Sequence, residues 1–149
     1  MILEEFDQNR KAIINPEDLI EPIKGFPQTA VSCFARETFA RMLADFDHEL
    51  ITTTSMANIE IPIYRIFADG QELALFNAPV GASACVAILE DLIAFGMKKL
   101  VLFGTCGVLD EDIKATSVII PTAALRDEGT SYHYQPASSE IAVNVGLQD

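Results

Sequence analysis

Hydrophobic and polar positions recur along this chain with two different periods, which together predict an α/β fold. Apolar residues at helical spacing predict helices over Glu37–Phe46 and Ser83–Phe95, with Ser83 capping the second helix and Gly96 ending it. Asp69-Gly70 predicts a hairpin turn between two strands. Segments rich in β-branched and aromatic residues predict strands or strand-like stretches at Thr29–Phe34, Ile59–Phe67, Glu72–Phe76, Leu100–Phe103, Ser117–Pro121 and Ala123–Arg126.

The segment Asn77–Gly107 is the centre of the predicted fold. It combines a strand end, a glycine turn, a helix, a second strand and a Gly-Thr-Cys-Gly loop, which together make a βαβ unit. Such units place ligand-binding loops at the carboxyl ends of their strands. The uninterrupted apolar run Leu100–Phe103 predicts a strand that is buried on both faces of a parallel sheet.

The sequence predicts two parts, an N-terminal arm and an α/β domain. Residues 1–28 carry three prolines and scattered charges, which predict an N-terminal arm packed on the domain or on a neighbouring subunit. Residues 29–149 predict an α/β domain, but no helix is predicted after Ile141 to cover its last strands. We therefore expect a domain that is truncated at its C-terminus. The alternative is a compact domain that ends in a loop.

The acidic composition narrows the range of partners. The net charge of −12 is spread along the 149 residues and repels phosphate backbones and anionic lipid, so neither nucleic acid nor membrane is an expected partner. No apolar run is long enough to span a bilayer, and no basic leader precedes one. Three widely spaced cysteines predict reduced thiols in a cytoplasmic protein, and neither histidine has the spacing of a metal ligand.

Two glycine-containing stretches are candidates for binding an anion. In Gly104-Thr105-Cys106-Gly107 the glycines let backbone amides approach a ligand and Thr105 offers a hydroxyl, although such strand ends are also ordinary turns. Gly81 opens the second predicted helix, whose N-terminus suits anionic or polar groups. For Cys106 we expect a buried, unreactive thiol rather than a nucleophile.

The segment Arg126–Tyr134 is polar and aromatic, and its lack of periodicity predicts a loop near a strand end. It offers an arginine for anions, carboxylates for hydroxyls or protons, and aromatic faces for a flat ring. A solvated loop with an internal Arg–Asp pair is an equally good interpretation of its composition.

Taken together, these stretches resemble the nucleoside phosphorylase family, in particular its uridine-phosphorylase-like branch. The matching pieces are the helix entry VGAS, the segment VLFGTCGVL at Val101–Leu109 and the segment IIPTAALRDEGTSYHY at Ile119–Tyr134. The resemblance covers residues 29 to 140 and implies a three-layer α/β fold with a mixed, distorted sheet between helices. It also implies the reversible phosphorolysis of uridine or a purine nucleoside to free base and ribose 1-phosphate.

The resemblance further implies the site residues and partners. Inorganic phosphate is the co-substrate, no metal or organic cofactor takes part, and the protein forms a homo-oligomer. The implied phosphate ligands are Arg36, Gly104, Thr105 and Arg126. The implied substrate-binding residues are Gly81, Cys106, Gly107, Asp127, Glu128, Tyr132 and His133, and no catalytic residue is assigned.

The sequence departs from the family pattern in two ways. The family's Gly-Asp-Pro-x-Arg motif falls on Ser32-Cys33-Phe34-Ala35-Arg36, and its second phosphate arginine falls on Leu102. The family's ribose- and base-binding segments lie in a second half that follows the matched region, so we expect the 149-residue chain alone to be weakly active or inactive. A hydrolytic nucleosidase and a non-catalytic nucleoside-binding or assembly module are therefore the alternatives.

Overall fold

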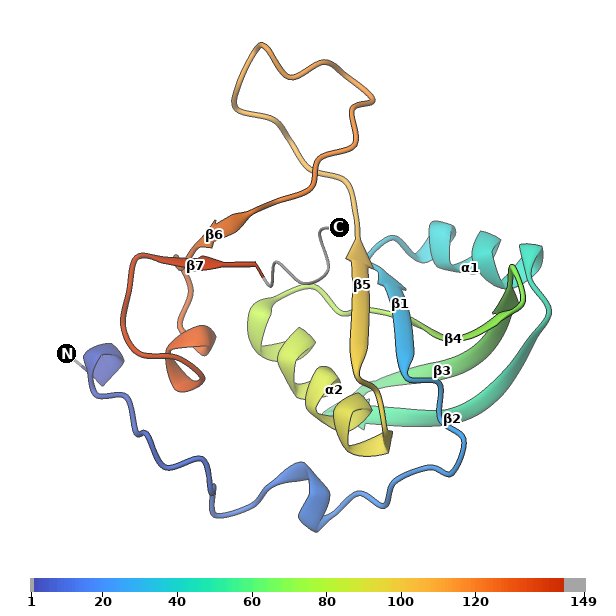
Figure 1. The fold of residues 1–149 in the computed structure, drawn as a ribbon, viewed down its shortest axis with the longest axis horizontal. Coiled ribbons are helices and arrows are strands. Elements are labelled where there is room, and N and C mark those ends of the chain that lie inside the picture. The colour runs from blue at the N-terminus through green and yellow to red at the C-terminus, as the bar shows by residue number, and fades with distance from the viewer. Residues whose placement is uncertain (1, 144–149) are drawn as a thin grey trace. The chain divides into compact units, whose positions relative to one another are not determined.

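The computed structural model of the chain describes residues 2–143, and the chain divides into two compact units (Figure 1). Lys11–Thr105 forms an α/β unit, which holds the sheet and both α-helices. Met1–Arg10 together with Cys106–Asp149 forms the second unit. None of the helices among the described residues is long and apolar enough to cross a membrane.

The α/β unit is built on a mixed five-stranded sheet in the order β2-β3-β4-β1-β5. Strand β4 pairs in parallel with β1, and β1 in parallel with β5, whereas β2, β3 and β4 pair antiparallel. A register shift between Leu50 and Thr52 distorts β2. The strands are β1 (Thr29–Cys33), β2 (His48–Met56), β3 (Ile59–Ala68), β4 (Gln71–Asn77) and β5 (Lys99–Phe103).

Two helices cover opposite faces of this sheet. Helix α1 (Arg36–Asp45) contacts β1 and β4, and its Phe39 ring lies 6.1 Å from the Tyr64 ring of β3. Helix α2 (Ala82–Phe95) contacts β2 and packs on the core that contains Ile63. Because Ile63 and Tyr64 are neighbours in β3, they point to opposite faces. The predicted fold class, a mixed sheet between helices, is confirmed.

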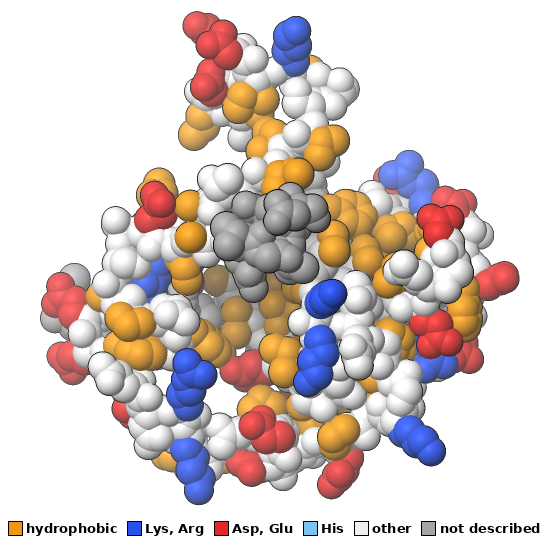
Figure 2. Space-filling view, viewed as in Figure 1, with side chains coloured by type: hydrophobic (Ala, Val, Ile, Leu, Met, Phe, Trp, Pro, Cys, Tyr) orange, Lys and Arg blue, Asp and Glu red, His pale blue; other side chains and the backbone are white. Residues whose placement is uncertain are grey.

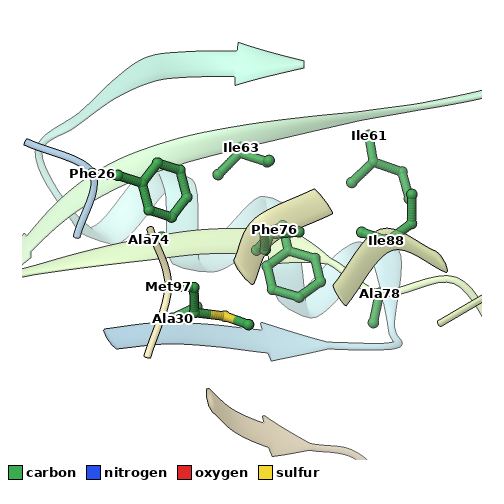
Figure 3. Close-up of a cluster of buried hydrophobic side chains, with 10 residues drawn as sticks. Phe26, Ala30, Ile61, Ile63, Ala74, Phe76, Ala78, Ile88 and Met97 are labelled. Atoms are coloured by element: carbon green, nitrogen blue, oxygen red, sulfur yellow. The ribbon is translucent and has the colours of Figure 1, made fainter. Parts of the chain in front are cut away.

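The main core lies between the sheet and α2 (Figure 3). Alternate residues of β3 and β4 meet Ile88 and Leu92 of the helix there, as a strand with one face buried on a core requires. The buried members of this cluster are Phe26, Ala30, Ile61, Ile63, Ala74, Phe76, Ala78, Ile88, Leu92 and Met97.

Local sequence signals at several turns are confirmed. Asp69 and Gly70 have φ values of 49° and 75° and join β3 to β4, as the Asp-Gly pair predicts. Gly96 ends α2 with φ 131°, a conformation in which an L-residue is strained. Within the predicted N-terminal arm, Pro16–Asp18 forms a short 3₁₀ turn, η2, and Phe26 is part of the core.

Several sequence predictions about the elements are wrong. Ser83 is not the N-cap of α2; Gly81 occupies that position, because its φ of 110° turns the chain one residue before the helix starts at Ala82. Strand β5 is not buried on both faces, since it is an edge strand with β1 as its single partner among the described residues. Its Val101, Leu102 and Phe103 side chains are 53%, 40% and 40% exposed. Strand β2 was not predicted.

The second unit contains a two-stranded antiparallel sheet of β6 (Ala123–Leu125) and β7 (Glu140–Ala142). The 3₁₀ turns η1 (Ile2–Glu4) and η3 (Thr130–His133) contact each other. Ser117–Pro121 is not a strand; none of the strands among residues 2–143 pairs with it, and Val118 is 92% exposed. Figure 2 shows apolar side chains on the surface of the loop that follows β5, beside acidic ones.

Candidate functional site

The carboxyl ends of three parallel strands meet at one edge of the α/β sheet. Because β1, β4 and β5 run in the same direction, the segments that follow them lie along this edge. Arg36 follows β1, Gly81 follows β4, and Gly104 and Thr105 follow β5. Of the residues predicted to bind phosphate, the fold therefore brings Arg36, Gly104 and Thr105 to the same edge, together with Gly81.

A cleft of about 550 Å³ opens at this edge. Part of its wall comes from the start of β3, and the rest comes from the chain after β1 and after β4. Its lining residues are Arg36, Phe39, Ile59, Glu60, Ile61, Pro62, Asn77, Ala78, Pro79, Val80 and Ala84.

Both helices of the unit begin at the cleft. Arg36 is the first residue of α1, and Ala84 lies in the first turn of α2. A helix N-terminus carries a partial positive charge and favours an anion. An exposed guanidinium and two helix N-termini thus contribute positive charge at the cleft, whereas Glu60 contributes a negative charge there.

Two hydrogen bonds tie the carboxyl end of β1 to the end of β4. The Ser32 hydroxyl donates to the Phe76 carbonyl at 2.8 Å, and the Asn77 amide donates to the Cys33 carbonyl at 2.7 Å. Cys33 is buried, and this burial raises the pKa of its thiol. The thiol donates a hydrogen bond to the Ala35 carbonyl. The Ser32 side chain and the Cys33 carbonyl thus hold the strand end in place, and both residues are buried.

Gly104 lies close to this same junction. A Cβ atom at Gly104 would lie 3.1 Å from Cδ2 of Phe34, which is tighter than ordinary van der Waals contact. A residue without a side chain therefore allows the end of β5 to approach the segment that leads to Arg36.

Arg126 belongs to the second unit, where its side chain is 6% exposed. Its guanidinium donates to the Ser131 and Ser138 hydroxyls, each at 2.9 Å, and to the Gln135 and Pro136 carbonyls. The guanidinium also lies 4.1 Å from the centre of the Tyr132 ring. A phosphate contact by Arg126 stays a prediction, and it would compete with these bonds.

The Glu128 carboxylate accepts hydrogen bonds from the backbone amides of Thr130 and Ser131 and from the Ser131 hydroxyl. Hydrogen bonds from Ser131 lower the pKa of Glu128; the bond from the Ser131 side chain has the largest effect, and the bond from its backbone amide comes next. Glu128 therefore caps η3. A direct contact between Glu128 and a substrate stays a prediction.

The remaining predicted site residues also lie in the second unit. Cys106, Gly107, Asp127 and His133 are exposed there, whereas Tyr132 is half-buried and its hydroxyl donates to the Arg126 carbonyl. The expectation of a buried Cys106 is wrong, because Cys106 follows an edge strand and none of the described elements covers it. The roles of these residues toward a substrate stay predictions.

Two polar side chains of the cleft, Glu60 and Asn77, are not among the site residues that the sequence predicts. Glu60 is the second residue of β3, and its place on the cleft depends on the antiparallel pairing of β3, which no local motif announces. Its carboxylate can accept hydrogen bonds from hydroxyl groups. Among residues 2–143, no group of three or more His, Cys, Asp or Glu is arranged to hold a metal ion.

Comparison with known proteins identifies the family. The model of the phosphorylase superfamily matches residues 31–148, and the chain belongs to this superfamily. Guanosine phosphorylase from Halorubrum lacusprofundi is 29% identical over 89 residues, which are 60% of this chain and 35% of that protein. Uridine phosphorylase from Haemophilus influenzae is 27% identical over 96 residues, 64% of this chain and 36% of that protein.

A solved structure shares the fold of this chain. The crystal structure of uridine phosphorylase from Vibrio fischeri matches with a TM-score of 0.68 at 19% sequence identity, covering 95% of this chain and 57% of that one. The resemblance to the phosphorylase family predicted from the sequence is thereby confirmed. The chain spans about a third of the length of the two relatives compared above, at 35% and 36%.

Proposed function

We propose that this chain carries the phosphate-binding side of a nucleoside phosphorylase. In the proposed reaction, a phosphate oxygen attacks the anomeric carbon of a nucleoside while the bond from that carbon to the base breaks. The electron pair of that bond leaves with the base, which then takes up a proton, and the sugar is released as ribose 1-phosphate. Uridine or a purine nucleoside is the proposed substrate.

The observation that carries this proposal is the arrangement of one edge of the sheet. Arg36 and the N-terminus of α2 line the cleft at this edge, and Gly104 and Thr105 follow β5 at the same edge without lining the cleft. A guanidinium, a hydroxyl and a helix N-terminus are the groups that bind phosphate in proteins. In the transition state the sugar carries positive charge, and a phosphate anion held beside it stabilises that charge. The cleft lined by Arg36 and Glu60 is the proposed place for the sugar.

Labelled phosphate tests this proposal directly. The chain is incubated with uridine, inosine or guanosine and ³²P-phosphate, and the products are separated. Slow transfer of label into ribose 1-phosphate, lost in Thr105→Ala, is the expected result. Release of unlabelled ribose at a rate that does not depend on phosphate would contradict the proposal, as would the absence of both transfer and phosphate binding.

A hydrolytic nucleosidase is the second candidate, and Leu102 is the observation that favours it. This position takes an apolar, partly exposed side chain where the family pattern has an arginine. One bidentate contact to phosphate is thereby missing, which reduces the stabilisation of a bound phosphate by about 1.5–3 kcal/mol. Phosphate-independent release of ribose would identify this activity. Binding of nucleoside without any turnover would identify a non-catalytic module.

Homo-oligomerisation and a cytoplasmic location stay predictions. Sedimentation equilibrium of the purified chain tests the first, with a mass above 16.3 kDa as the expected result.

A further inference from the structure

The loop between β6 and β7 folds around one buried arginine. Arginine has five N–H donors in a planar fork. In Arg126, four of them are used: Nε donates to Ser131, the two donors of Nη1 to Pro136 and Ser138, and one donor of Nη2 to Gln135. All four acceptors are neutral oxygens of the loop itself.

Two further contacts close this network. The Tyr132 ring lies under the guanidinium, and the Tyr132 hydroxyl returns a hydrogen bond of 3.0 Å to the Arg126 carbonyl. Ser131 accepts from Arg126 and donates to Glu128, so that it links the guanidinium to the carboxylate that caps η3. The Arg126 amide donates to Ser139 at 3.0 Å and extends the pairing of β6 with β7.

From this network we infer that Arg126 is a positioning residue, which holds the loop Asp127–Glu140 in one conformation instead of binding phosphate. An anion ligand needs donors that point away from the protein, whereas four of the five donors here point into their own loop. The ordered loop presents the exposed Asp127, His133 and Tyr134 side chains. An imidazole, a carboxylate and an aromatic ring suit the base and hydroxyls of a nucleoside. This last step rests on the proposed function.

Lysine cannot replace Arg126 in this role. Its three donors share one atom, whereas the four acceptors come from residues 131, 135, 136 and 138 and surround a planar group. The charge is kept in Arg126→Lys, so this variant separates the geometry of the network from its electrostatics. Ser131→Ala is the complementary variant, because it removes the link to Glu128 and leaves Arg126 in place.

Hydrogen exchange and calorimetry together test the assignment. We expect amides within residues 128–140 to exchange about tenfold faster in Arg126→Lys, since a hydrogen bond to a charged group is lost, and also faster in Ser131→Ala. Exchange in β1 and β4 and the affinity for inorganic phosphate should stay unchanged in both variants. Nucleoside affinity should fall. Arg41→Lys, on the surface of α1, is the matched control and should behave as the parent chain.

Three results would overturn the assignment. The first is unchanged exchange in the loop together with phosphate affinity lowered about tenfold or more, which would make Arg126 a phosphate ligand. The second is unchanged exchange with unchanged affinity. The third is equally faster exchange throughout the α/β unit, which would mean general unfolding. If the parent chain binds no phosphate but its loop responds as expected, the proposed function fails and the role of Arg126 stands.

Discussion

Replacing Arg36 with glutamine separates phosphate binding from fold stability. Arg36 is exposed, is the first residue of α1 and lines the cleft. Arg41 lies on the same helix, is also exposed, and donates one hydrogen bond to Thr38. Arg36→Gln and Arg41→Gln each remove one positive charge, so both change the overall field equally. A difference between the two variants therefore reports the local contact of Arg36.

The two expected effects of Arg36→Gln have opposite signs. A hydrogen bond between a charged group and an anion contributes about 1.5–3 kcal/mol, which corresponds to about 10- to 150-fold in affinity. Because Arg36 is exposed and screened by water, we expect the lower end, about tenfold weaker binding of phosphate at low salt. A cation at a helix N-terminus is unfavourable, so its removal should stabilise the fold by about 0.3–1 kcal/mol.

Isothermal titration calorimetry with inorganic phosphate measures the affinity, and unfolding in urea measures the free energy of unfolding. Arg41→Gln should leave both close to those of the parent chain, because position 41 lies inside the helix and away from the cleft. Equal loss of phosphate affinity in both variants would contradict a local contact between Arg36 and phosphate, since the overall charge would then explain the binding. Lower stability of Arg36→Gln would refute the argument from the helix N-terminus.

Three further predictions concern the fold. Leu92→Ala should lower the free energy of unfolding by about 2–5 kcal/mol in urea titrations, because Leu92 is fully buried between α2 and the sheet. A decrease of less than about 0.5 kcal/mol, as for a surface residue, would contradict the burial of Leu92. Gly96→Ala should lower the free energy of unfolding by about 1–3 kcal/mol, because the φ of residue 96 is 131°. Gly107→Ala should leave this free energy nearly unchanged, because the space around Gly107 is open. Equal decreases in the two variants would contradict backbone strain at residue 96. Iodoacetamide at pH 8 should modify Cys106 first, as judged by peptide mass spectrometry. Burial raises the pKa of Cys33, so its reactive thiolate forms only at higher pH, and equally fast labelling of Cys33 would contradict its burial.

The sequence predicts correctly those elements that depend on interactions between residues close together in the chain. The helical spacing of apolar residues gives both α-helices to within one residue, and Asp69-Gly70 gives the turn between β3 and β4. The sequence does not predict β2, although Ile51 and three consecutive threonines are β-branched, because apolar and polar residues do not alternate cleanly over His48–Met56. Its place in the sheet depends on pairing with β3, which is a long-range property.

In the candidate site, too, residues with a local sequence signal were predicted and residues placed by long-range pairing were not. The sequence predicts Arg36, Gly104 and Thr105 from the family pattern, and parallel pairing brings them to one edge, whereas their contacts with phosphate stay predictions. Glu60 was missed because it reaches the cleft from an antiparallel strand. The burial of Arg126 could not be predicted either, since its acceptors include backbone carbonyls that any sequence would offer.

Phosphate binding by the purified chain, located by hydrogen exchange, decides whether the edge of the sheet around Arg36 and Thr105 is a phosphate site. We expect saturable binding of one phosphate per chain, with slower exchange in the segments around residues 36, 81–84 and 104–105. No phosphate-dependent change is expected within residues 128–140. Absence of saturable binding, or protection confined to residues 128–140, would contradict a phosphate site at this edge.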